Sequence, residues 1–127
     1  MSNHSPKLDH IGLPVTSLDK SKAFYTAALA PLGMSMLGES DNHAAFGIGH
    51  MPYLSVRLTE RVAGSTHVAF LADSRAQVDA FHLAGINAGG TDAGAPGLRP
   101  DYHEHYYAAF VRDPDSHNIE LVKHAPE

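Results

Sequence analysis

Ten histidines occur in a sequence of 127 residues that contains no cysteine. A metal site in this chain must therefore be built from imidazole and carboxylate groups. Two of the histidines, His10 and His67, begin short apolar runs, and Glu120 is the only charged residue inside the apolar run 118–122. Two histidines and one carboxylate with open positions form a facial triad, which suits Fe(II) and also accepts Mn(II) or another divalent ion.

An internal repeat makes His10 and His67 equivalent. A shift of 57 residues places His10 on His67, and the same shift aligns Phe24 with Phe81. In each half, an apolar run is followed by a helix-capping residue, a helical pattern and a terminal glycine. If the halves pack with pseudo-two-fold symmetry, we expect the two imidazoles to meet at the axis and to face one cavity.

The elements that must position these side chains follow one order in both halves, β-α-β-β-β. In the first half, the pattern predicts a strand over 10–15, a helix between the caps Thr16 or Ser17 and Gly33, and strands over 34–37, 44–48 and 53–58. Pro31 should disrupt the last turn of the helix. Strand alternation places Glu120 on the opposite side from its apolar neighbours, where a carboxylate is costly unless it is paired or metal-bound.

The second half predicts a strand over 66–72, a helix between the capping-box residues Ser74 and Gln77 and the pair Gly89 and Gly90, and strands over 106–111 and 118–122. The Gly/Pro-rich segment 94–100 is expected to be a long, functional loop. The sequence therefore predicts an α+β fold of two βαβββ modules, about 7–60 and 64–124, in one domain spanning 1–127.

The repeat also identifies the position of a fourth ligand. A shift of 65 residues places Ser55 where Glu120 lies and preserves the alternation of apolar and polar residues. Serine is a poor ligand, so we expect three protein ligands, with water or substrate supplying the rest. Each residue has a simpler interpretation as well: His10 and His67 as hydrogen-bonded core residues, and Glu120 as an exposed charge on an edge strand.

A second dense group of polar residues lies in segment 99–107. Arg99 could bind an anionic substrate, Tyr106 could line the pocket, and His103 or His105 could act as acid or base. Alternatively, the segment is a solvated loop that its tyrosines anchor by packing. The remaining histidines are expected at the surface: His4, His43, His50, His82, His117 and His124.

Composition excludes several classes of protein. The formal net charge of −5 argues against a nucleic-acid binder, which needs a basic surface. Neither a secretory signal nor an apolar run long enough to cross a membrane is visible. The absence of cysteine fits a reducing compartment, so we expect a cytoplasmic protein.

Residues 8–15, 21–25, 66–70, 110–115 and 118–121 resemble the vicinal oxygen chelate superfamily of glyoxalases, fosfomycin- and bleomycin-resistance proteins and extradiol dioxygenases. The resemblance implies paired modules that form a cup-like, curved mixed sheet around a divalent metal ion such as Fe, Mn, Zn or Ni. It places His10, His67 and Glu120 on the metal positions. The carboxylate that glyoxalase I enzymes carry on the fourth strand is missing in 52–56, so three-ligand members match better.

The resemblance implies a metalloenzyme that acts on a small, oxygen-rich substrate as a lyase, transferase or dioxygenase. We expect Glu120, Tyr106 and His105 to be catalytic. Tyr53, Ser55, Arg99 and His103 are the expected substrate-binding residues. The alternatives are a metal-free protein that binds a small toxic molecule and a domain whose cavity is vestigial. We expect a homodimer, and the cup could form within one chain or across the dimer.

Overall fold

The computed structural model of the protein describes residues 7–127, so the expectation for His4 lies outside the described residues. Module 1 consists of β1 (Ile11–Val15), α1 (Leu18–Leu29), the short helix η1 (Ala30–Leu32), β2 (Ser35–Ser40), β3 (His43–Ile48) and β4 (Met51–Leu58). Module 2 consists of β5 (His67–Leu71), α2 (Arg75–Asn87), β6 (Thr91–Leu98), β7 (Tyr107–Arg112) and β8 (Asn118–Lys123).

Each module forms its own four-stranded mixed sheet. The strand orders are β1-β4-β3-β2 and β5-β8-β7-β6, and the first strand of each module is parallel to the last. The remaining pairs are antiparallel. The predicted α+β class and the two βαβββ modules are therefore confirmed.

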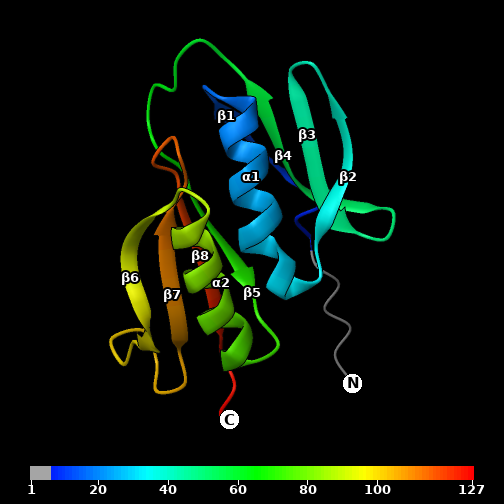
Figure 1. The fold of residues 1–127 in the computed structure, drawn as a ribbon. Helices are drawn as coiled ribbons and strands as arrows, with labels where there is room; N and C mark the ends of the chain where they lie inside the picture. Colours follow the sequence, from blue (N-terminus) through cyan, green and yellow to red (C-terminus); the bar gives the residue numbers. More distant parts are fainter. Residues whose placement is uncertain (1–6) are drawn as a thin grey trace.

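The two helices pack against each other, and each covers one face of its own sheet (Figure 1). Strand alternation sends Leu13 and Val15 of β1 into the core below the helices, whereas Gly12 and Pro14 point to the other side and are exposed. We call the sheet surface that is turned away from the helix the open face of each module. The site described below lies on the open face of module 2.

Local sequence signals fix the ends of both helices. The Ser17 hydroxyl accepts the N–H of Lys20 at 3.2 Å, and the Ser74 hydroxyl accepts the N–H of Gln77 at 3.1 Å. After α1, Pro31 lies in η1, and Gly33 ends it with a φ of 80°, in the left-handed region that favours glycine. The predicted caps, and the disruption of the last turn, are confirmed.

The structure corrects the prediction of a long loop over 94–100. Residues 91–98 form β6, which pairs with β7 in a register that shifts between Asp92 and Gly94 and again between Gly94 and Gly97. Pro96 falls inside the second shift, where it need not donate a ladder hydrogen bond. Glycine and proline therefore mark bulges in an edge strand rather than a break in the sheet.

The modules share one core. Phe24 of α1 and Phe81 of α2 are fully buried, and a Cβ atom added at Gly90 would lie 2.6 Å from a Phe24 ring carbon. No helix within residues 7–127 is both long and apolar enough to cross a membrane.

Candidate functional site

Glu120 lies at the centre of β8 and is buried, with 1% of its surface exposed. Its neighbours Ile119 and Leu121 belong to the core, so alternation directs Glu120 to the open face, as predicted. In the sheet register Glu120 lies opposite Ala69 of β5 and Phe110 of β7. A carboxylate in this place requires partners, because burial of an uncompensated charge is costly.

Both carboxylate oxygens of Glu120 have a partner. Nε2 of His67 donates to Oε1 at 2.8 Å, and the hydroxyl of Tyr106 donates to Oε2. The His67 ring packs beside Phe110 and remains about half exposed, so the group is reachable from solvent. We call Glu120, His67 and Tyr106 the acid cluster. Two of its members are predicted catalytic residues and two are predicted metal ligands.

Tyr106 keeps its proton at neutral pH. Burial, followed by the hydrogen bond to Glu120 and its charge, raises the pKa of the Tyr106 phenol well above the ordinary value, against a smaller opposing effect of Arg99. Tyr106 directly precedes β7 and packs against the ring of Tyr102. It can therefore serve as a hydrogen-bond donor beside Glu120, but not as a base.

His10 does not join the acid cluster within one chain. It directly precedes β1, is largely exposed, and its Nδ1 donates to Asp9 at 2.7 Å. It lines a pocket to which β5 contributes Val68 to Leu71, and His67 does not belong to that lining. The expectation that both imidazoles face one cavity within a chain is therefore wrong. Within residues 7–127, no three His, Asp or Glu side chains are grouped so that they could hold an ion.

The directions of β1 and β5, the first strands of the two modules, explain why His10 and His67 lie apart. The beginning of β5 lies near the end of β1. His117 accepts the N–H of Thr66, just before β5, and donates to the carbonyl of Pro14, near the end of β1. The strands therefore run past each other in opposite directions, as Figure 1 shows. Equivalent residues at their beginnings are separated rather than brought together.

The predicted equivalence of Ser55 and Glu120 agrees with the pairing register. Ser55 of β4 lies opposite Gly12 of β1, two residues after His10, just as Glu120 lies opposite Ala69, two residues after His67. Ser55 and Tyr53 lie on module 1, in hollows that the residues of the acid cluster do not line. Their predicted role in substrate binding stays a prediction.

Arg99 is anchored within its own strand region. Its guanidinium donates to the carbonyls of Gly97 at 2.9 Å and Ala95 at 2.7 Å, and it lies over the Phe110 ring. These contacts close the bulge of β6. They also place a positive charge over the ring that contacts His67. The predicted role of Arg99 in binding an anionic substrate stays a prediction.

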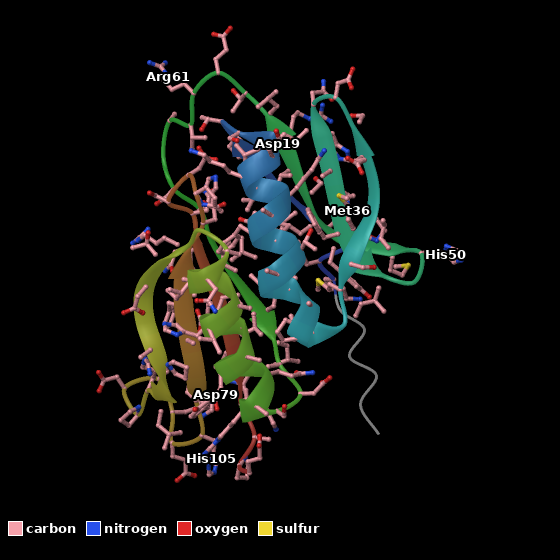
Figure 2. The ribbon with its side chains drawn as sticks, viewed as in Figure 1. Asp19, Met36, His50, Arg61, Asp79 and His105 are labelled. Atoms are coloured by element: carbon pink, nitrogen blue, oxygen red, sulfur yellow. The ribbon has the colours of Figure 1, made fainter. Side chains whose placement is uncertain are left out.

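His103 and His105 make no hydrogen bond to the acid cluster. Nδ1 of His103 accepts the N–H of His105 at 3.1 Å, so Nε2 carries the hydrogen of the neutral ring and donates to Nδ1 of His124 at 2.9 Å. The His105 ring lies near Glu104, at the end of module 2 where Figure 2 labels it. Their predicted roles as substrate-binding and catalytic residues stay predictions.

The expected surface position of His117 is wrong, because its side chain is fully buried. It accepts the N–H of Thr66 at 3.0 Å and donates to the carbonyl of Pro14 at 2.8 Å. Thr66 directly precedes His67, so His117 holds the backbone that presents the imidazole to Glu120. Sequence reasoning missed this residue, since nothing local distinguishes it from a surface histidine. His50, by contrast, lies at the tip of the β3–β4 hairpin and points outwards, as expected (Figure 2).

Paired βαβββ modules with a buried acid on the last strand define a recognisable class of protein. Residues 7–121 match the Glyoxalase/Bleomycin resistance protein/Dioxygenase superfamily. The chain belongs to this superfamily. No protein with curated annotation matches it.

Solved structures support the same fold. A glyoxalase/bleomycin resistance protein from Albidiferax ferrireducens T118 is 29% identical with a TM-score of 0.78, over 90% of this chain and 96% of that one. A lactoylglutathione lyase from Agrobacterium tumefaciens is 21% identical, with a TM-score of 0.66 over 90% of each chain. The fosfomycin resistance protein FosX from Mesorhizobium loti is 19% identical, with a TM-score of 0.68 over 98% of this chain and 94% of that one.

Proposed function

We propose that this protein is a glyoxalase-like metalloenzyme that acts on a small, oxygen-rich substrate as a lyase, transferase or dioxygenase. The observation that carries the proposal is the acid cluster, in which a buried carboxylate on the open face meets an imidazole and a phenol. A buried acid in contact with reachable polar groups is typical of functional sites. The cysteine-free composition supports a cytoplasmic location.

The donor groups of one chain fit a divalent ion in part. Nε2 of His67 and the Glu120 carboxylate are adjacent and have the chemistry that Fe, Mn, Zn or Ni accepts, whereas His10 lies elsewhere. A bound ion would supply Lewis-acid polarisation of substrate oxygens. Tyr106 would hold its proton near those oxygens. Arg99 and His103 would contact the substrate, and His105 would move a proton.

His10 would have to come from a second copy, so the proposal includes a homodimer. β1 and β5 each pair with a neighbour on one side only, so each is an edge strand of its sheet, as β2 and β6 are. Leu8 and Leu71 near these edges are 73% and 68% exposed. An exposed apolar surface beside unpaired edges favours association. Tyr53 and Ser55 of one protomer would then face the acid cluster of its partner.

Titration of metal-free protein with Mn(II), Ni(II), Zn(II) or anaerobic Fe(II) tests the metal site. We expect Glu120→Gln and His67→Ala to weaken binding of the preferred ion at least tenfold, because each removes one ligand. Glu104→Gln is the matched control, since Glu104 is exposed and makes no contact with Glu120. Equal metal affinity in wild type and Glu120→Gln would exclude Glu120 as a ligand.

Mixed dimers test whether the site is shared. His10→Ala and Glu120→Gln should each bind little metal alone. If each site takes His10 from one chain and Glu120 from the other, unfolding and refolding the two variants together regenerates one intact site per mixed dimer. Metal binding that returns only in the mixture supports the shared site, and no return contradicts it.

One observation favours the metal-free binding protein as a second candidate. His67 and Tyr106 already satisfy both oxygens of Glu120, so the acid cluster is stable as a hydrogen-bonded group. In that case the dissociation constants of Mn(II), Ni(II), Zn(II) and Fe(II) would all be millimolar or weaker. The open faces would then hold a small molecule by shape and hydrogen bonds alone.

A further inference from the structure

A buried polar atom on the open face of module 2 has no hydrogen-bond partner. Among the residues that the structure describes, no group donates to Oδ1 of Asn118, although this atom is shielded from solvent. A carbonyl oxygen in this state is unusual, because buried polar atoms are nearly always hydrogen-bonded. Asn118 begins β8, and its backbone N–H donates to the carbonyl of Thr66 at 2.9 Å. The unpaired group therefore belongs to the side chain.

The neighbours of Asn118 on the open face include both proposed ligands of module 2. Asn118 lies on the same face as Glu120, two residues later, and directly opposite His67 in the parallel pairing of β5 with β8. Adjacent strands are about 4.8 Å apart, so the imidazole and the amide are neighbours. On the other side, Arg112 of β7 lies opposite Asn118, but its guanidinium donates to the carbonyl of Ser116 at 2.9 Å.

The His67 ring has the tautomer that cannot use this acceptor. Nε2 carries the hydrogen that is donated to Glu120 at 2.8 Å, which leaves Nδ1 of the neutral ring without a hydrogen. A bare ring nitrogen and a carbonyl oxygen are both acceptors, so they form no hydrogen bond with each other. In this tautomer Oδ1 of Asn118 stays unpaired.

The other tautomer is the one that binds an ion through Nε2. The ring then loses the hydrogen on Nε2 to water and takes one from water on Nδ1, so its charge does not change. Histidines that bind metal ions generally donate this second hydrogen to an acceptor, which fixes the orientation of the ring. We propose that Asn118 is a positioning residue, whose Oδ1 accepts the Nδ1–H of His67 and thereby favours the metal-binding tautomer. This inference rests on the proposed metal site and names the group that prepares one of its ligands.

Asn118→Leu removes the acceptor and keeps the shape of the side chain. In titrations of metal-free protein, we expect the affinity for the preferred ion to fall by about ten- to a hundredfold. Asn118→Asp keeps an acceptor and should bind the ion at least as tightly as the wild type. Asn87→Leu is the matched control, because Asn87 is exposed at the end of α2, and it should not change the affinity.

The melting temperature of the metal-free protein tests whether Asn118 only supports the sheet. Asn118→Leu should melt at the same temperature as the wild type or above it, because the unpaired oxygen has no hydrogen bond to lose. A lower melting temperature would show that Asn118 holds the strands or Arg112 in place, and would contradict the proposal.

Nitrogen NMR reads the tautomer of His67. Long-range nitrogen–proton correlations separate ring nitrogens with and without hydrogen, and the His67 signals are those that disappear in His67→Ala. We expect the hydrogen on Nε2 in the metal-free protein and on Nδ1 with zinc bound. In Asn118→Leu saturated with zinc, the Nδ1 hydrogen should exchange faster with water. Zinc on Nδ1, or equal exchange rates in the two proteins, would overturn the proposal.

The titration of the wild type separates this inference from the proposed function. If the wild type binds an ion and Asn118→Leu binds it equally well, Asn118 has no positioning role and the proposed metal site stands. If the wild type binds no ion, the proposed metal site fails, and the inference fails with it.

Discussion

The phenol of Tyr25 donates a 2.5 Å hydrogen bond to the carboxylate of Asp113, across the boundary between the two modules. Both side chains are buried, and the other oxygen of Asp113 accepts the N–H groups of Asp115 and His117. Asp115 in turn accepts the N–H and the hydroxyl of Thr16, at the end of β1. The β7–β8 turn is thereby fixed to the first strand and first helix of the other module.

Tyr25→Phe should lower the free energy of unfolding by about 1–3 kcal/mol, because it leaves a buried carboxylate without one of its partners. Urea denaturation at neutral pH measures the effect. Tyr107→Phe is the control: its hydroxyl also bonds an aspartate, Asp79, but at an exposed site. A loss in Tyr107→Phe as large as that in Tyr25→Phe would show that burial of Asp113 is not the cause.

Stability should decline at alkaline pH. Burial, reinforced by Asp113, raises the pKa of Tyr25, as burial and Glu120 raise that of Tyr106. Above about pH 10 the buried Tyr25 ionises in the unfolded chain but not in the folded one, so this group lowers the free energy of unfolding by about 1.4 kcal/mol per pH unit. Below that pH its contribution is intact. Urea denaturation across this range should show a shallower decline in Tyr25→Phe, and an identical decline would contradict the assignment.

Phe81→Ala should cost about 3–5 kcal/mol of stability, since the ring is fully buried between the modules and its removal leaves a cavity. Phe24→Ala, at the equivalent position, should cost about the same. Leu83→Ala on the same helix as Phe81 is the control, with a side chain that is 65% exposed. Its effect should stay within about 0.5 kcal/mol.

Gly90→Ala should be destabilising by about 1–3 kcal/mol, because the new methyl group would overlap Val111 and Phe24. Gly38→Ala provides the comparison, as a Cβ there meets nothing within 4 Å. Thermal unfolding distinguishes the two variants. Equal melting temperatures would show that the modules separate easily to make room.

Metal binding should be visible as added stability. An ion at a hundredfold excess over its dissociation constant adds about 2.7 kcal/mol to a protein that binds it only when folded. Glu120→Gln should lose this increment while the metal-free protein stays within about 1 kcal/mol of wild type, because the amide retains hydrogen bonding and removes a buried charge. A strongly destabilised metal-free variant would instead show that Glu120 holds the fold together.

The sequence alone predicts those features that residues close together in the chain determine. Ser17 and Ser74 cap their helices, Gly33 adopts the left-handed conformation, and alternation places Glu120 away from the core. The partners of His117 are 51 and 103 residues away, so no local pattern indicates that this imidazole is satisfied inside the protein. The separation of His10 from His67 likewise depends on how two rigid modules pack, which periodicity within each module does not specify.

The correspondence of Ser55 with Glu120 gives equivalent positions of the two repeats a different sensitivity to substitution. In the second repeat, the acid is tied to His67 and Tyr106, so most changes around it disturb three groups at once. In the first repeat, the hydroxyl at the same place lies beside Gly12 and carries no charge that needs a partner. A substitution around Ser55 therefore disturbs fewer partners than one around Glu120, so the two halves of the repeat differ in how much change they tolerate.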